Sequence, residues 1–205
     1  DDSNVSRING SPPFNNEGSF IKSGGTGTSI IASGILFVNT GSVDVQTGTL
    51  QLTTTATHTG TFDFTGATLQ FNGGTHDLPV AHTLTGTNAI FDSGTVNMPG
   101  PYNVTGTTTV TGGTANWTGR IVDIGDLDLL SGTANLSNTE GLVTQPTIEQ
   151  PAGTLTGTSD FTVTGRFTWT GGVQEGTGET NANGGLSLSG SGTKELRRTL
   201  NNPVS

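Results

Sequence analysis

The chain of 205 residues contains no cysteine, which excludes disulfides, zinc–thiolate sites and cysteine nucleophiles. Basic residues are also scarce: seven Lys and Arg stand against 16 Asp and Glu, for a formal net charge of −9. This balance argues against nucleic acid as a partner and against adhesion to an anionic membrane surface. Acidity of this kind keeps a long molecule in solution.

Long apolar runs and helical periodicity are missing as well. The longest apolar stretch, residues 30–38, is interrupted by Ala32-Ser33-Gly34, so it predicts no membrane insertion. Apolar spacing of i, i+3, i+4 and i+7 does not persist anywhere, and Gly or Pro interrupts almost every window of ten. The sequence therefore predicts an all-β fold.

The chain begins Asp1-Asp2-Ser3, without Met and without a basic and apolar leader. This start fits an exported protein after removal of its signal, an excised fragment, or a cytosolic protein after trimming of a tag. The lack of cysteine and the acidic balance are common in secreted bacterial proteins. We therefore expect an extracellular or cell-surface location.

What the chain does contain is a short phrase, Gly-Thr followed by alternating apolar positions, that returns at nearly even intervals. The phrase begins at Gly48, Gly74, Gly94, Gly113, Gly132 and Gly153. From Gly74 onward, the intervals between successive glycines in the numbering are 20, 19, 19 and 21. A period of this length without helices is typical of a solenoid, in which each repeat forms one coil and buries its apolar side by stacking on the next.

Hydrophobic residues make up only 29% of the chain, yet nearly all of them lie in short alternating runs that predict half-buried strands. These runs include Val43/Val45, Leu50/Leu52, Phe62/Phe64, Leu69/Phe71, Val96/Met98, Leu127/Leu129, Phe161/Val163 and Phe167/Trp169. A solenoid can fold with so few apolar groups because its core is a narrow column.

We therefore predict a single-stranded parallel β-helix, or β-solenoid, with a right-handed winding. It should have about ten coils, each of roughly 19–21 residues. Residues 14–202 are expected to form it, with residues 1–13 as an N-terminal extension or cap and residues 203–205 as a C-terminal tail.

Four segments of the chain resemble a known kind of repeat: residues 14–25, 37–45, 165–172 and 190–194. They are similar to the Gly/Thr-rich parallel β-helix repeats of large secreted bacterial adhesin-like or autotransporter-like surface proteins. The resemblance implies an exported β-helix, and it brings no catalytic residues with it.

The ends of the predicted solenoid expose unpaired strand edges, which natural solenoids cover with caps. No strong cap is evident in the sequence. Leu200-Asn201-Asn202 resembles Phe14-Asn15-Asn16, as if the chain stopped where a new repeat set would start. We therefore predict a self-assembly interface at Phe14, Asn15, Asn16, Leu200, Asn201 and Asn202. Either the chain is part of a longer array, or copies stack head to tail by strand addition.

The sequence offers only weak candidates for catalytic or metal-binding residues. Asp123, Asp126 and Asp128 form the best acidic cluster, which could hold Ca²⁺ or serve a polysaccharide-active enzyme, although a solvated strand face explains them more simply. His58, His76 and His82 are not at metal-ligand spacing, and His76-Asp77 is expected at a turn. No catalytic residue, metal ligand or cofactor is predicted.

The aromatic and threonine patterns suggest two further kinds of binding surface, one for sugars and one for ice. Trp117 and Trp169 could stack on sugars, but inward packing explains them as well, whereas Tyr102 is expected to be exposed at a corner. Thr-x-Thr runs, such as those at Thr83/Thr85/Thr87 and Thr154/Thr156/Thr158, could form a flat ladder of hydroxyl groups that binds ice. The high β propensity of threonine is the simpler explanation, because the phase of these runs drifts.

Together these features predict a non-enzymatic structural protein: a secreted β-solenoid subunit or repeat segment of a bacterial extracellular fibre, sheath or surface appendage. Its partners would be copies of itself. The alternatives are an adhesin passenger domain that binds glycans or other surface ligands, and a β-helix enzyme that acts on polysaccharide.

Overall fold

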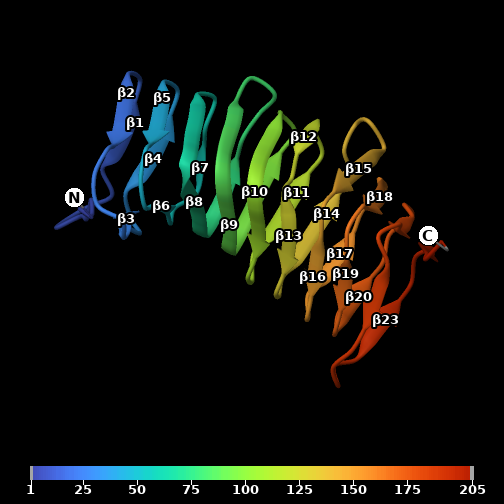
Figure 1. Ribbon diagram of the computed structural model, residues 1–205. Helices are drawn as coiled ribbons and strands as arrows, with labels where there is room; N and C mark the ends of the chain where they lie inside the picture. Colours follow the sequence, from blue (N-terminus) through green and yellow to red (C-terminus); the bar gives the residue numbers. More distant parts are fainter. Residues whose placement is uncertain (1, 204–205) are drawn as a thin grey trace.

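The computed structural model describes residues 2–203, which contain strands and turns and no helix. The strands lie side by side along a rod, with the two termini at opposite ends (Figure 1). Each strand pairs in parallel with the equivalent strand of at least one neighbouring coil, and most pair on both sides. This confirms the predicted all-β parallel solenoid of about ten coils. Within residues 2–203, no helix is present that could span a membrane.

The chain follows three faces in each coil, which we call faces a, b and c. Face a contains β2 (Ser19–Lys22), β5 (Ser42–Val45), β12 (Ile121–Asp123), β15 (Leu142–Gln145), β18 (Asp160–Val163), β21 (Thr180–Ala182) and β24 (Leu200–Asn201). Face b contains β3 (Thr28–Ile31), β6 (Thr49–Leu52), β13 (Asp126–Leu129), β16 (Ile148–Gln150), β19 (Phe167–Trp169) and β22 (Leu186–Leu188). Face c contains β1 (Pro13–Asn16), β4 (Leu36–Asn39), β7 (Ala56–Thr57), β11 (Thr114–Trp117), β14 (Thr133–Leu136), β17 (Thr154–Thr156), β20 (Gly172–Gln174) and β23 (Lys194–Leu196).

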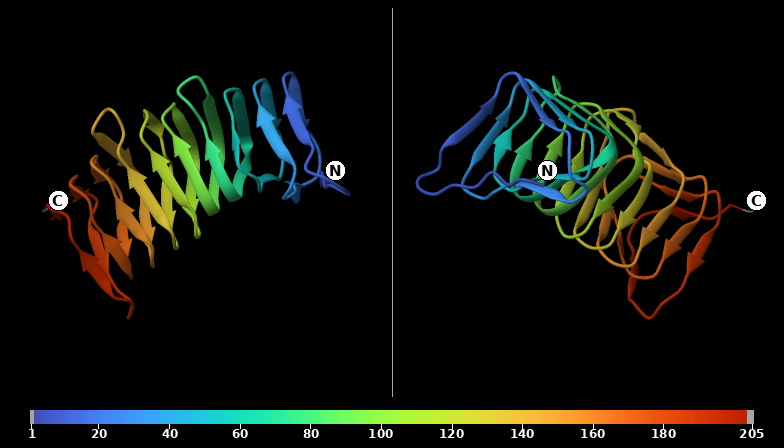
Figure 2. Two further views of the ribbon diagram at one scale, coloured as in Figure 1. Left: turned by 180° about the vertical axis from the view of Figure 1, so that it is seen from behind. Right: turned by 60° about the vertical axis from the view of Figure 1, so that its left-hand side comes forward.

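Three longer strands continue around the corners of the coil, and two of them contain glycines with positive φ at those corners. β8 (Thr61–Asp77) and β9 (Thr83–Met98) each cross all three faces, and β10 (Tyr102–Val110) crosses faces a and b. The right-hand view of Figure 2, which looks obliquely along the stack, shows the chain turning repeatedly around one axis.

Coil length varies more than the glycine spacing suggests. Paired residues are 19 apart between Thr114 and Thr133, 18 apart between Leu84 and Tyr102, and 23 apart between Phe14 and Phe37. The strands keep their register because the corners absorb the difference, as between β8 and β9, where Thr61 and Thr83 are 22 apart. The range of coil lengths predicted from the sequence is therefore too narrow.

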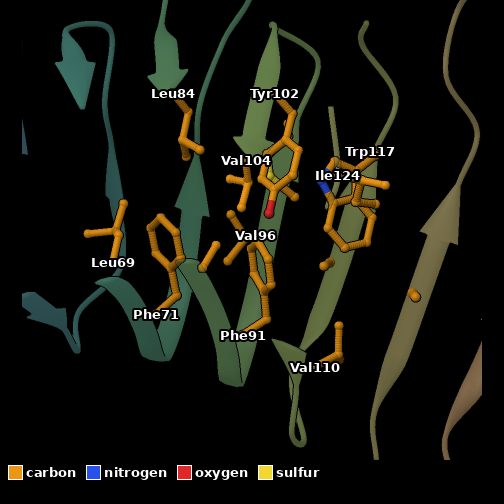
Figure 3. Packing of buried hydrophobic residues seen from close by; sticks show 14 of the residues in the cluster. Leu69, Phe71, Leu84, Phe91, Val96, Tyr102, Val104, Val110, Trp117 and Ile124 are labelled. Atoms are coloured by element: carbon orange, nitrogen blue, oxygen red, sulfur yellow. The ribbon is translucent and has the colours of Figure 1, made fainter. Parts of the chain in front are cut away.

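The core is a narrow column of side chains that point inward from all three faces. Burial alternates along the strands, so that in β13 Leu127 and Leu129 are buried while Asp126 and Asp128 are partly exposed. Aromatic rings stack from coil to coil: the ring centroids of Phe71 and Phe91 are 5.7 Å apart, and Trp117 meets Phe91 edge to face at 5.3 Å (Figure 3). Offset and edge-to-face ring pairs of this kind add stability beyond the buried area.

From Gly74 onward, the repeated glycine stands at the corner between faces b and c, whereas Gly48 precedes β6 at the corner between faces a and b. At Gly94 the backbone has a φ of 78°, and a Cβ atom there would collide with the carbonyl oxygen of Gly74 in the preceding coil. Gly74 and Gly132 also have positive φ. Only glycine combines this left-handed conformation with so close a stacking of corners, which explains why the phrase Gly-Thr recurs.

Outward side chains also form ladders along the rod. On face c, Asn116 Nδ2 donates to Asn97 Oδ1 at 2.9 Å and Asn135 Nδ2 donates to Asn116 Oδ1 at 3.1 Å. Asn97 in turn donates to Asp77 Oδ1 at 2.7 Å. The amides of Asn97 and Asn116 therefore donate to one coil and accept from the next, which ties the register of four successive coils together.

The core column predicts a large difference between inward and outward truncations on the same strand. Phe91→Ala should lower the free energy of unfolding by about 3–5 kcal/mol because it opens a cavity between stacked rings. Ile90→Ala, which removes an outward side chain from β9, should cost less than about 1 kcal/mol. Denaturant unfolding of both variants measures this, and equal losses would contradict the assigned inward direction.

Candidate functional site

The two ends of the rod are where the structure is incomplete. β1 and β2 pair on one side only, with β4 and β5, and β22, β23 and β24 likewise pair only with the coil before them. Backbone groups along such an edge can accept a further strand. We define the N-terminal end as residues 2–5 with β1 and β2, and the C-terminal end as β22, β23 and β24.

At the N-terminal end, residues 2–5 lie along β3 as a short parallel strand would. Val5 N–H donates to Ile30 O and Ala32 N–H donates to Val5 O, both at 2.9 Å, and Val5 pairs with Ile31 in a parallel bridge. The side chain of Asn4 accepts from Ile30 N–H at 2.8 Å. The segment thus occupies on face b the place of a preceding coil.

A buried cation anchors this segment. Lys22 Nζ is 3.1 Å from Asp2 Oδ1 and donates to Gly24 O at 2.9 Å, and its side chain is only 3% exposed. The hydrogen bond from Lys22, followed by that from the backbone of Gly27, lowers the pKa of Asp2. Beside it opens a cavity of about 400 Å³, lined by Val5, Phe20, Ile31 and Leu50 among others. This cavity lies at the uncovered N-terminal end of the core column.

The predicted interface residues of the N-terminal end play different roles. Phe14 faces inward and meets the rings of Phe20 and Phe37, with centroids 5.7 and 5.1 Å away, while Asn15 is exposed. Asn16 is buried, and its Nδ2 donates to Asn39 Oδ1 at 2.8 Å in the next coil. Its side chain is therefore engaged within its own chain.

The predicted interface residues of the C-terminal end lie on a different face. Leu200 and Asn201 belong to β24 on face a and pair with Thr180 and Asn181, whereas Phe14 belongs to face c. Asn202 follows β24 and is exposed. The similarity between Leu200-Asn201-Asn202 and Phe14-Asn15-Asn16 therefore does not reflect a common phase: the N-terminal strand that continues face a is β2.

The C-terminal end leaves core positions uncovered. Leu188 pairs with the buried Trp169, and Leu196 pairs with the buried Gln174, so both side chains point along the core column. They are nevertheless 59% and 52% exposed, because no further coil covers them. Sequence reasoning did not single out these two leucines: Leu188 follows the alternating pattern with Leu186, whereas Leu196 stands alone among charged residues.

Asp123, Asp126 and Asp128 do not converge on one point. Asp126 and Asp128 lie on the outward side of β13, and Asp123 lies on β12, where its carboxylate accepts from Gly125 N–H. Burial, then the neighbouring charges of Glu149 and Asp126, raises the pKa of Asp128. Within residues 2–203, no group of three His, Cys, Asp or Glu side chains is placed to hold a metal ion.

The three histidines are all buried, and His76 is a strand residue of β8, not the turn residue that the sequence predicts. His58 and His76 form a chain: Asn39 N–H donates to His58 Nδ1 at 3.3 Å, His58 Nε2 lies 3.2 Å from His76 Nδ1, and His76 Nε2 lies 3.0 Å from Gly73 O. This chain is consistent when both rings are neutral and carry their proton on Nε2. Burial is the main cause that lowers the pKa of His58 to about 3 and that of His76 to about 4.

The aromatic candidates belong to the core. Trp117 is fully buried and Trp169 is 3% exposed, which confirms inward packing. Tyr102 is also fully buried, so its predicted exposure at a corner is wrong. Its hydroxyl lies 2.7 Å from Thr108 Oγ1, which donates to Ile124 O, and burial raises its pKa. A polar partner inside the column is what allows this tyrosine to face inward.

The Thr-x-Thr runs do not form one ladder. Thr83 and Thr85 point outward on face a, while Thr154 and Thr156 point outward on face c. The structure instead aligns a different set of threonines on face c: Thr75, Thr95, Thr114, Thr133 and Thr154. The phase drift seen in the sequence therefore corresponds to a change of face.

Comparison of the chain with protein-family models, with curated proteins and with solved structures finds no match. The structure itself shows the parallel β-solenoid. The resemblance to adhesin-like and autotransporter-like surface proteins remains a hypothesis.

The histidine chain predicts that stability falls in acid. Unfolded histidine takes up a proton near pH 6.5, whereas folded His58 and His76 do so only near pH 3 and 4, so stability present above about pH 6.5 is lost as the pH falls through this window. Between pH 7 and 5 each histidine should contribute a loss of about 2 kcal/mol.

Denaturant unfolding at both pH values measures this loss. The double variant His58→Gln/His76→Gln should be less stable at pH 7 but should show a smaller difference between the two pH values. An unchanged difference in the double variant would contradict the assignment.

Proposed function

We propose that this protein is a non-enzymatic structural element: a β-solenoid subunit or repeat segment of an extracellular fibre, sheath or surface appendage that stacks end to end by strand addition. One observation carries the proposal. At both ends, inward core positions and strand edges remain uncovered, most clearly at Leu188 and Leu196.

The energetic argument follows from burial. A core leucine gains about 1.5–3 kcal/mol when its side chain is removed from water, and unpaired backbone groups gain partners when another strand is added. Both gains are available at the ends of the rod, whether the next coil comes from a second copy or from a longer chain. The sides of the rod offer no equivalent gain, because their outward residues are mainly polar, as in β11, β13 and β14.

The alternatives receive less support from the geometry. A glycan-binding adhesin would gain support from exposed aromatic rings, but Tyr102 and Trp117 are fully buried. A polysaccharide-active enzyme would need two carboxylates facing each other across a groove. Asp126 and Asp128 instead lie side by side on the outward side of one short strand.

End-to-end stacking predicts that a charge at the C-terminal end blocks assembly. Leu196→Asp should abolish threads in negative-stain images and reduce the protein to monomers in sedimentation velocity, because a carboxylate would replace an apolar group in the junction. Leu130→Asp is the matched control, since Leu130 is 41% exposed but lies in the middle of the rod. Threads that persist in Leu196→Asp, or a wild-type protein that stays monomeric at high concentration, would contradict stacking of copies.

A further inference from the structure

We infer that a second copy of this chain docks its C-terminal end on the N-terminal end in one register: β22 beside residues 2–5, β23 beside β1, and β24 beside β2. This inference rests on the proposed function and assigns the partner, the surface and the strand pairing.

The order of faces is the first argument. At the N-terminal end the chain follows face b with residues 2–5, face c with β1 and face a with β2. At the C-terminal end it follows face b with β22, face c with β23 and face a with β24. At both ends, the chain therefore passes from one coil to the next at the same corner, between faces a and b. A second copy can therefore stack so that every strand meets a strand of its own face.

The inward columns are the second argument. On face b, Trp169 and then Leu188 end one inward column of the first copy. In the second copy, Val5 and then Ile31 begin the same column, so Leu188 would lie next to Val5. Leu188 and Val5 are 59% and 38% exposed. The junction would cover both.

Faces c and a give the same result. On face c, Leu196 would lie over Phe14, and on face a, Leu200 would lie over Phe20. Phe14, Phe20 and Leu200 are partly buried and pack against the core from its ends. All three columns thus meet apolar on apolar. The cavity of about 400 Å³ at the N-terminal end, which Val5 and Phe20 line, is the space into which Leu188 and Leu200 would pack.

Charge does not oppose this contact. Lys22, the buried cation at the N-terminal end, already has Asp2 and the carbonyls of Gly24 and Gly25 as acceptors. At the C-terminal end, the guanidinium of Arg198 donates to the carbonyls of Ser159 and Glu179 at 3.0 and 3.1 Å. Stacking therefore buries cations that are hydrogen bonded within their own copy, which lowers the cost of burying their charge.

The register can be tested by disulfide trapping, because the chain has no cysteine of its own. Ile21 and Asn201 both point outward on face a and are exposed, so they flank the junction without filling it. Neighbouring strands are about 4.8 Å apart, a separation that a disulfide can bridge. The double variant Ile21→Cys/Asn201→Cys should give, under mild oxidation, a covalent ladder of dimers, trimers and larger species on a denaturing gel.

The matched control is Asp44→Cys/Asn201→Cys. Asp44 pairs with Ile21 one coil further from the junction, so the two cysteines would be roughly 10 Å apart and should give no ladder. The single variant Ile21→Cys tests head-to-head contact, which can give dimers only.

The outcomes separate this register from the proposed function. Threads in the wild-type protein without a ladder from Ile21→Cys/Asn201→Cys would overturn the register and leave end-to-end stacking standing. Equal ladders from the test pair and the control pair would also overturn the register. The absence of both threads and a ladder would overturn the second copy as the partner, and stacking of copies with it.

Discussion

Parallel backbone pairing between successive coils is the interaction on which the rest of this structure depends. Each strand is too short to be stable alone, and each coil has only a few inward side chains, so both are stabilised by the coils on either side. The rest follows from this repetition: the corner glycines, the stacked rings of Phe71 and Phe91, and the amide ladder of Asn97, Asn116 and Asn135 all repeat with the coil.

The same dependence makes the ends the part of the molecule where binding is favoured. In the middle of the rod, most strands pair with a coil on each side, and the inward apolar side chains are covered. At the ends the last coil has one neighbour, so Leu188 and Leu196 are exposed although their equivalents in earlier coils are buried. In the proposed end-to-end stacking, a structural role would need no built pocket, because the uncovered leucines and strand edges would supply the affinity and the direction of assembly.

The interior also holds polar groups, several of which are hydrogen bonded to one another. Tyr102 finds Thr108, and His58 and His76 satisfy each other and the backbone. Gln174 lies in the same column and donates to Gln150. The narrow column makes these pairs possible, because side chains that point inward from different faces, or from non-equivalent positions of neighbouring coils, meet there.

The alternating apolar residues and the glycine period were enough to predict the parallel solenoid and the inward packing of Trp117 and Trp169, because strand periodicity and coil length are local properties of the sequence. Local patterns could not predict which strands share a face. Phe14 and Leu200 look equivalent in sequence, but the variable corners place them on faces c and a. His76 and Tyr102 look like corner residues because polar side chains are usually exposed, yet each lies inside the column beside a partner from elsewhere in the chain. The exposure of Leu188 and Leu196 was likewise decided only by the tertiary structure, since it depends on whether another coil lies above them and not on the residues beside them in sequence.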